Sequence, residues 1–143
     1  MFFFKVTGNL RECAEMKLKS AGINTDIFKR NGILFGGFGN DHIDRPKLVE
    51  KAIERAHLEI DQKLNPSDFI VIGDTPKDMH CGHVNNVPGV AVATGIFNLD
   101  GLRDCSDAVL EDFTDIEKTL STFRSVQYIP RSVDYDYDKN VTE

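Results

Sequence analysis

Two uninterrupted apolar runs constrain the fold of this chain more than any other feature. They are Phe-Ile-Val-Ile at 69–72 and Val-Ala-Val-Ala at 90–93, and neither alternates with polar residues. A strand with this pattern is buried on both faces, which is typical of a parallel sheet covered by helices. Helical patterns lie before, between and after the two runs, so the sequence predicts an α/β fold with right-handed crossovers.

Capping residues mark where the two longest helices begin and end. Asn9 and Glu12 have the spacing of a capping box, and Gly22 is placed to end the helix that follows in the left-handed conformation. Asp44 and Pro46 precede the most regular apolar stripe of the chain. That stripe consists of Leu48, Val49, Ala52, Ile53, Ala56 and Ile60.

The remaining elements are shorter. Further strands are expected at 2–6, 33–35 and 107–110, and the glycine-rich stretch 36–39 is expected to be a loop. Further helices are expected from Thr75-Pro76 to about residue 85, around 101–103, and over 113–123.

The length of 143 residues fits one domain. We expect a folded core over residues 1–125. The segment that ends the chain, RSVDYDYDKNVTE, is acidic and has no apolar period. Residues 126–143 are therefore predicted to form an acidic, disordered tail.

Composition excludes several classes of function. The formal net charge is −6 with both signs mixed along the chain, which argues against nucleic acid or a membrane surface as a partner. No run approaches the ~18 apolar residues of a membrane-spanning helix. The three cysteines are far apart and form no C-x-x-C pair, which is typical of reduced thiols in a cytoplasmic protein.

Two polar triplets come directly after predicted strands and before predicted helices. They are Thr7-Gly8-Asn9 and Gly73-Asp74-Thr75. Ligands of open parallel sheets bind past the carboxyl ends of the strands, and helix N-termini favour anions. Two such sites on one sheet edge indicate a phosphate ligand.

Asp74 and Asp78 lie four residues apart at the second of these strand ends. Two neighbouring carboxylates can share Mg²⁺, which prefers one or two carboxylates together with waters and a substrate phosphate. The competing interpretation is an ordinary helix start, with Thr75 as N-cap, Pro76 in the first turn and Asp78 as the capping-box acid. The spacing alone leaves both interpretations open.

Several motifs in a fixed order resemble the haloacid dehalogenase-like (HAD) hydrolases. VIGDTPKDMHCG is followed by VPGVAVATGIFNLDGLRDCSDAVLEDFTD, and both resemble the C-terminal half of that family. Earlier in the chain, VTGNL and DRPKLVEKAIERA resemble its second and third motifs. The resemblance covers about residues 3–120 and is nearest to the phosphoglycolate phosphatase-like group. It implies a three-layer, Rossmann-like parallel sheet and Mg²⁺-dependent hydrolysis of a small phosphorylated substrate.

The resemblance also implies roles for single residues. Thr7 would hold a phosphate oxygen, with the N–H groups of Gly8 and Asn9 beside it. Arg45 would neutralise charge on the phosphoryl group, and Lys47 is a rival for that role.

For the metal, the resemblance implies that Asp74 binds Mg²⁺ directly or through water and that Asp78 supports it. The family's first motif, D-x-D-x-T, carries the aspartate nucleophile and does not occur in these 143 residues. We therefore expect an incomplete HAD-like core that lacks the nucleophile strand and the cap, either a fragment or a chain whose sheet is completed by self-association or by a partner chain. Two functions stay open: a phosphatase-type hydrolase, or a non-catalytic remnant or interaction subunit that binds metal or phosphate weakly.

Overall fold

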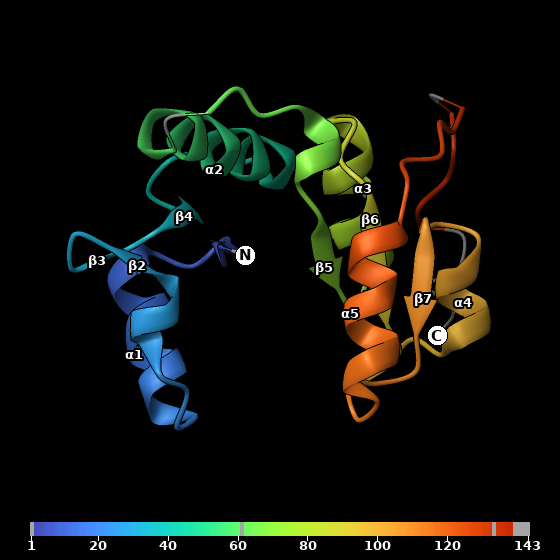
Figure 1. The fold of residues 1–143 in the computed structure, drawn as a ribbon, viewed down its shortest axis with the longest axis horizontal. Helices are drawn as coiled ribbons and strands as arrows, with labels where there is room; N and C mark the ends of the chain where they lie inside the picture. Colours follow the sequence, from blue (N-terminus) through green and yellow to red (C-terminus); the bar gives the residue numbers. More distant parts are fainter. Residues whose placement is uncertain (1, 61, 133, 139–143) are drawn as a thin grey trace. The chain divides into compact units, whose positions relative to one another are not determined.

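The computed structural model describes residues 2–60, 62–132 and 134–138. The chain divides into two compact units, Met1–Lys63 and Leu64–Glu143. Both units combine helices with short strands, and their elements are labelled in Figure 1. Over the described residues, no helix has the length and apolar character needed to cross a membrane.

The first unit holds two small sheets. Strand β1 pairs in parallel with β4, with Thr7 opposite Phe38, and β2 pairs antiparallel with β3. In chain order the elements are β1 (Lys5–Thr7), α1 (Arg11–Ser20), the 3₁₀ helix η1 (Thr25–Phe28), β2 (Lys29–Arg30), β3 (Ile33–Leu34), β4 (Gly36–Phe38) and α2 (Arg45–Glu59).

Strand β4 corrects the prediction that the glycine-rich stretch is a loop. A Cβ atom on Gly36, whose φ is +148°, would collide with the carbonyl oxygen of Lys5 on β1, and a Cβ on Gly37 would collide with that of Leu48 on α2. The two glycines therefore let the strand approach β1 on one side and α2 on the other. Glycine acts here as a packing residue and not as a turn former.

The start of α1 also differs from the prediction. Leu10, and not Asn9, occupies the N-cap position, and it makes no side-chain cap. The Asn9 side chain instead donates to Thr7 Oγ1 and accepts from Lys17 Nζ. The predicted end of this helix is confirmed, because Gly22 has a φ of +73° just after it.

The second unit holds a three-stranded parallel sheet in the order β5-β6-β7. In chain order the elements are the 3₁₀ helix η2 (Pro66–Asp68), β5 (Val71–Gly73), α3 (Pro76–Val84), β6 (Gly89–Val92), α4 (Leu99–Arg103), β7 (Ala108–Leu110) and α5 (Ile116–Ser125). The α/β fold class with parallel strands is thereby confirmed, as an incomplete Rossmann-like core. The predicted burial on both faces holds for β6 and not for β5, the end strand, where Ile72 is 41% exposed.

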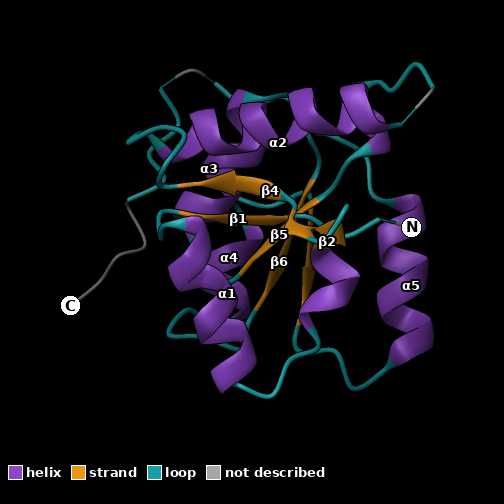
Figure 2. Ribbon diagram, turned by 90° about the vertical axis from the view of Figure 1, so that its left-hand side faces the viewer, coloured by secondary structure: helices purple, strands orange, loops and turns teal. Residues whose placement is uncertain are grey.

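Helices cover both faces of this sheet. Met79 of α3 and Leu102 of α4 pack with Ala91 of β6 on one face. Phe123 of α5 packs against a cluster that includes Val90 on the other face. Figure 2 shows the strands of this unit between α4 and α5. Neighbouring residues of β6 thus point to opposite layers, as the period of a strand requires.

The segment after α5 makes specific contacts with the rest of the second unit. Arg131 forms an ion pair of 2.9 Å with Asp107, and the two side chains are 11% and 3% exposed. Arg131 also donates to the carbonyl oxygen of Ser106 at 2.6 Å, and Tyr135 and Tyr137 pack against the Met79 cluster. Disorder over 126–143 stays a prediction, which these contacts make testable, and its residues 133 and 139–143 lie outside the described part.

Candidate functional site

The acids at the end of β5 are positioned by a helix cap. The strand ends at Gly73, and α3 begins three residues later, at Pro76, with Thr75 as its N-cap. Thr75 Oγ1 accepts from the backbone N–H of Asp78 at 3.2 Å and donates to Asp78 Oδ2 at 2.8 Å. Asp78 Oδ2 also accepts from the Thr75 backbone N–H at 3.2 Å. The predicted capping box is therefore confirmed.

Each carboxylate lies against a glycine. A Cβ atom on Gly73 would be 2.6 Å from Oδ2 of Asp78, and a Cβ on Gly95 would be 3.1 Å from Cγ of Asp74 and in collision with its Oδ2. Gly95 follows β6, the strand next to β5. The Asp74 carboxylate thus lies between the carboxyl ends of two neighbouring strands, where ligands of parallel sheets bind.

This donor set suits a hard cation with few protein ligands. Asp74 is exposed and Asp78 is partly buried. In the part of the chain that the structure describes, no group of three or more His, Cys, Asp or Glu side chains forms a candidate metal cage. One or two carboxylates completed by waters and a substrate oxygen are the usual ligands of Mg²⁺, whereas a structural zinc site needs four protein ligands.

The loop after β1 holds the candidate phosphate residues. Thr7 Oγ1 accepts from the backbone N–H of Asn9 at 3.2 Å and from its side-chain amide at 2.9 Å. The hydroxyl thus satisfies a nearby amide, yet no acceptor for its own proton is found among residues 2–60, 62–132 and 134–138. Gly8 between them is exposed. The loop can therefore offer a hydroxyl proton to an anion.

The two rival cations lie in the first turn of α2. Both Arg45 and Lys47 are exposed. Lys47 Nζ lies 2.7 Å from Glu50 Oε2 on the same helix, and that hydrogen bond raises the pKa of Lys47. The amine of Lys47 would have to leave that carboxylate to bind a phosphoryl group, and both Arg45 and Lys47 stay candidates for that role.

The predicted site residues fall into two sets. The acids belong to the second unit, and the loop of Thr7 with the two cations belongs to the first. The structure brings Asp74 and Asp78 to one strand end, and it gives Thr7, Gly8 and Asn9 one loop. That the two sets converge on one ligand stays a prediction.

Comparison with known protein families identifies the family of this chain. A family model described as HAD-hydrolase-like matches residues 45–116, about half of the chain. The chain belongs to the HAD-like hydrolases. The matched part of this HAD-like chain runs from the start of α2 to the start of α5 and contains Arg45, Lys47 and both acids. No curated protein matches the chain.

Two features of the site escaped sequence reasoning. One is Gly95, which lies against Asp74. It could have been expected from its position after the buried strand β6, which is the neighbour of β5. The other is the pairing of Asp41 with Arg55, in which Nη2 lies 2.7 Å from Oδ1. Fourteen residues separate the two in sequence, and only their positions in the fold bring them together.

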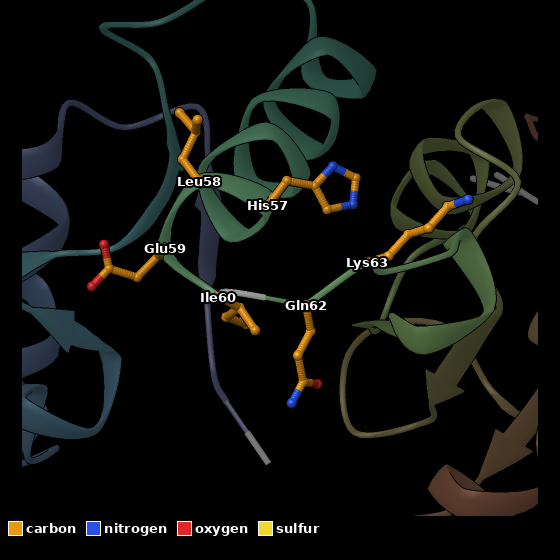
Figure 3. A pocket seen from close by; sticks show the side chains of 6 residues that line it. All are labelled: His57, Leu58, Glu59, Ile60, Gln62 and Lys63. Atoms are coloured by element: carbon orange, nitrogen blue, oxygen red, sulfur yellow. The ribbon is translucent and has the colours of Figure 1, made fainter.

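An open hollow at the end of α2 is unrelated to these residues. It is lined by His57, Leu58, Glu59, Ile60, Gln62 and Lys63. Figure 3 shows the side chains of Leu58, Glu59 and Lys63 pointing away from one another. Because its polar groups do not converge, this hollow lacks the form of a ligand site.

Proposed function

We propose that the chain is a phosphatase-type HAD-like hydrolase polypeptide, in which Asp74 and Asp78 hold Mg²⁺ for the hydrolysis of a phosphate monoester. The observation that carries the proposal is the placement of Asp74 against Gly95, at the carboxyl ends of two neighbouring parallel strands. Family membership adds the reaction class, and the hard oxygen donors fit the cation.

Each residue has a separate task in this proposal. Bound Mg²⁺ would neutralise charge on the phosphoryl oxygens. Asp74 would be the primary ligand and Asp78 a supporting one, although one oxygen of Asp78 also closes the cap of α3. The Thr7 hydroxyl donates a hydrogen bond to a phosphate oxygen, and Arg45 or its rival Lys47 supplies positive charge. The phosphoglycolate phosphatase-like group suggests small phosphorylated acids as the first substrates to test.

A second function is favoured by a different observation. Asp78 Oδ2 already accepts two hydrogen bonds from Thr75, so its role is explained without any metal. The D-x-D-x-T motif, which would supply an attacking carboxylate, does not occur in the sequence. A non-catalytic chain that binds metal or phosphate weakly, or serves as an interaction subunit, is consistent with both facts.

Turnover and metal binding separate the two functions. The purified chain is mixed with p-nitrophenyl phosphate and Mg²⁺, and Mg²⁺ binding is followed through the backbone amide shifts of Asp74 and Gly95. Turnover that disappears in Asp74→Asn supports the hydrolase. Asp100→Asn is the matched control, because Asp100 is an exposed acid of the same unit that forms an exposed ion pair of 3.9 Å with Arg103.

The remaining outcomes are equally decisive. Binding without turnover supports the non-catalytic chain. Equal Mg²⁺ affinity in the parent chain and Asp74→Asn would remove the metal site and, with it, the proposed hydrolase.

A further inference from the structure

The turn after β4 is fixed by an ion pair that reaches it from α2. Both Arg55 Nη1 and Nη2 donate to the Asp41 carboxylate, each at 2.7 Å, and the side chains are 25% and 12% exposed. Asp41 Oδ2 also accepts from the backbone N–H of Phe38 at 2.9 Å. Bidentate pairing fixes orientation as well as distance, so the turn has one defined geometry.

The turn after β4 also supports the loop of Thr7, through Gly39 and Asn40. The backbone N–H of Gly39 donates to the Asn9 carbonyl oxygen at 2.8 Å. Asn40 Oδ1 accepts from the backbone N–H of Arg11 at 2.8 Å and so replaces the missing side-chain cap of α1. A Cβ on Gly39 would collide with the carbonyl oxygen of Gly8, which places the two loops in direct contact.

The contacts form one continuous chain from Arg55 to the loop. Arg55 holds Asp41, Asp41 holds the end of β4, and the turn bonds to Asn9 in the loop and to Arg11 at the start of α1. Arg55 itself lies in the last turns of α2, and the candidate cations Arg45 and Lys47 lie in the first turn of the same helix.

We infer that Asp41 and Arg55 are positioning residues that set the conformation of the Thr7-Gly8-Asn9 loop for anion binding. The inference rests on the proposed function for the anion and on the contacts above for the positioning. The bond to Arg55 holds the pKa of Asp41 below its usual value, so the pair is intact at neutral pH. If the ion pair only stabilised the packing of α2 against β4, its removal would not change the loop of Thr7.

Inorganic phosphate is the probe, added to the full chain and followed through the amide shifts of Gly8 and Asn9. We expect Arg55→Met to weaken phosphate binding about tenfold and Arg55→Lys to restore part of it, because lysine keeps the charge and loses the bidentate geometry. Lys51→Met is the matched control, since Lys51 forms an exposed pair of 2.8 Å with Glu54 on the same helix. That control should bind phosphate like the parent chain.

Amide hydrogen exchange provides a second readout that does not depend on phosphate. In Arg55→Met and Arg55→Lys, exchange at the amides of Gly39 and Arg11 should accelerate at least about tenfold more than at Ala52 in the core of α2. If the parent chain binds no phosphate but this local acceleration occurs, the anion role fails and the positioning role stands. Uniform acceleration in both variants, or none, would overturn the inference.

Discussion

The two candidate strand ends are supported in different ways. After β5, the acids are held by the helix they begin, because Thr75 and Asp78 close a capping box three residues apart. After β1, the loop of Thr7 is held by a turn about thirty residues away, through Gly39 and Asn40. The first support can be read from a short stretch of sequence, whereas the second exists only once β4 has paired with β1.

The two kinds of support should respond differently to substitutions elsewhere in the fold. A locally capped acid should tolerate changes elsewhere in the fold, and a loop held from a distance should respond to them. Four substitutions probe contacts of both kinds.

Arg131→Met should have the largest effect. It leaves the Asp107 carboxylate, which is 3% exposed, without its cation, although the backbone N–H of Gly89 still donates to it. Breaking a buried pair in this way costs about 3 kcal/mol of unfolding free energy. Urea unfolding measures it, with Arg103→Met as the exposed control. Equal stability of the two variants would mean that the segment after α5 is disordered, as its composition predicts.

Gly73→Ala should cost about 2 kcal/mol, because the new Cβ would lie 2.6 Å from Cγ of Asp78 and must displace that side chain. The loss should be accompanied by weaker Mg²⁺ binding. Thermal unfolding and a Mg²⁺ titration check both effects. A variant as stable as the parent chain would contradict the close approach of Gly73 and Asp78.

Asp78→Asn should cost about 1 kcal/mol, the usual value for impairing a helix cap. Because this cap is local, amide hydrogen exchange at Gly8 and Asn9 should stay at the parent rate. An effect on that loop would show that the two strand ends are coupled.

His83 should give the smallest effect, a dependence on pH. Burial, helped by the charge of Arg131 and His80 and opposed by Asp107, lowers the pKa of His83 from 6.5. The folded state therefore prefers the neutral imidazole, whose Nδ1 lies 3.3 Å from the Tyr128 hydroxyl. Its contribution to stability is present above pH 6.5 and is lost as the pH falls through the lowered pKa.

The measurement for His83 is urea unfolding between pH 7.5 and pH 5. The stability of the parent chain should fall over this range, and His83→Gln should reduce the slope. An unchanged slope in the variant would assign the pH dependence to other groups.

Sequence reasoning was sound where the cause of a structure is local. The capping box of Thr75 and Asp78, the left-handed Gly22 and the apolar stripe of α2 all depend on neighbours within a few residues. The buried strand β6 was evident from its unbroken apolar run.

It failed where a distant residue takes over a local role. Asn9 does not cap α1, because Asn40 reaches the first helical N–H while the Asn9 side chain bonds to Thr7. Gly36 and Gly37 form a strand because the backbones of β1 and α2 come too close for any side chain. Strand β5 is an exception with a local cause: it begins at Val71, later than predicted, because the N–H of Phe69 bonds to the carbonyl oxygen of Pro66 in the preceding 3₁₀ turn.

Asp78 belongs both to the cap of α3 and to the proposed Mg²⁺ site, and this has a consequence for ion binding. A single oxygen of this carboxylate accepts from both the hydroxyl and the backbone N–H of Thr75. If the proposed ion site exists, a cation that recruited that oxygen would compete with the first turn of α3, so occupancy of the site and fraying of the helix would be thermodynamically linked. Conditions that stabilise the first turn of α3 would then weaken ion binding at this carboxylate.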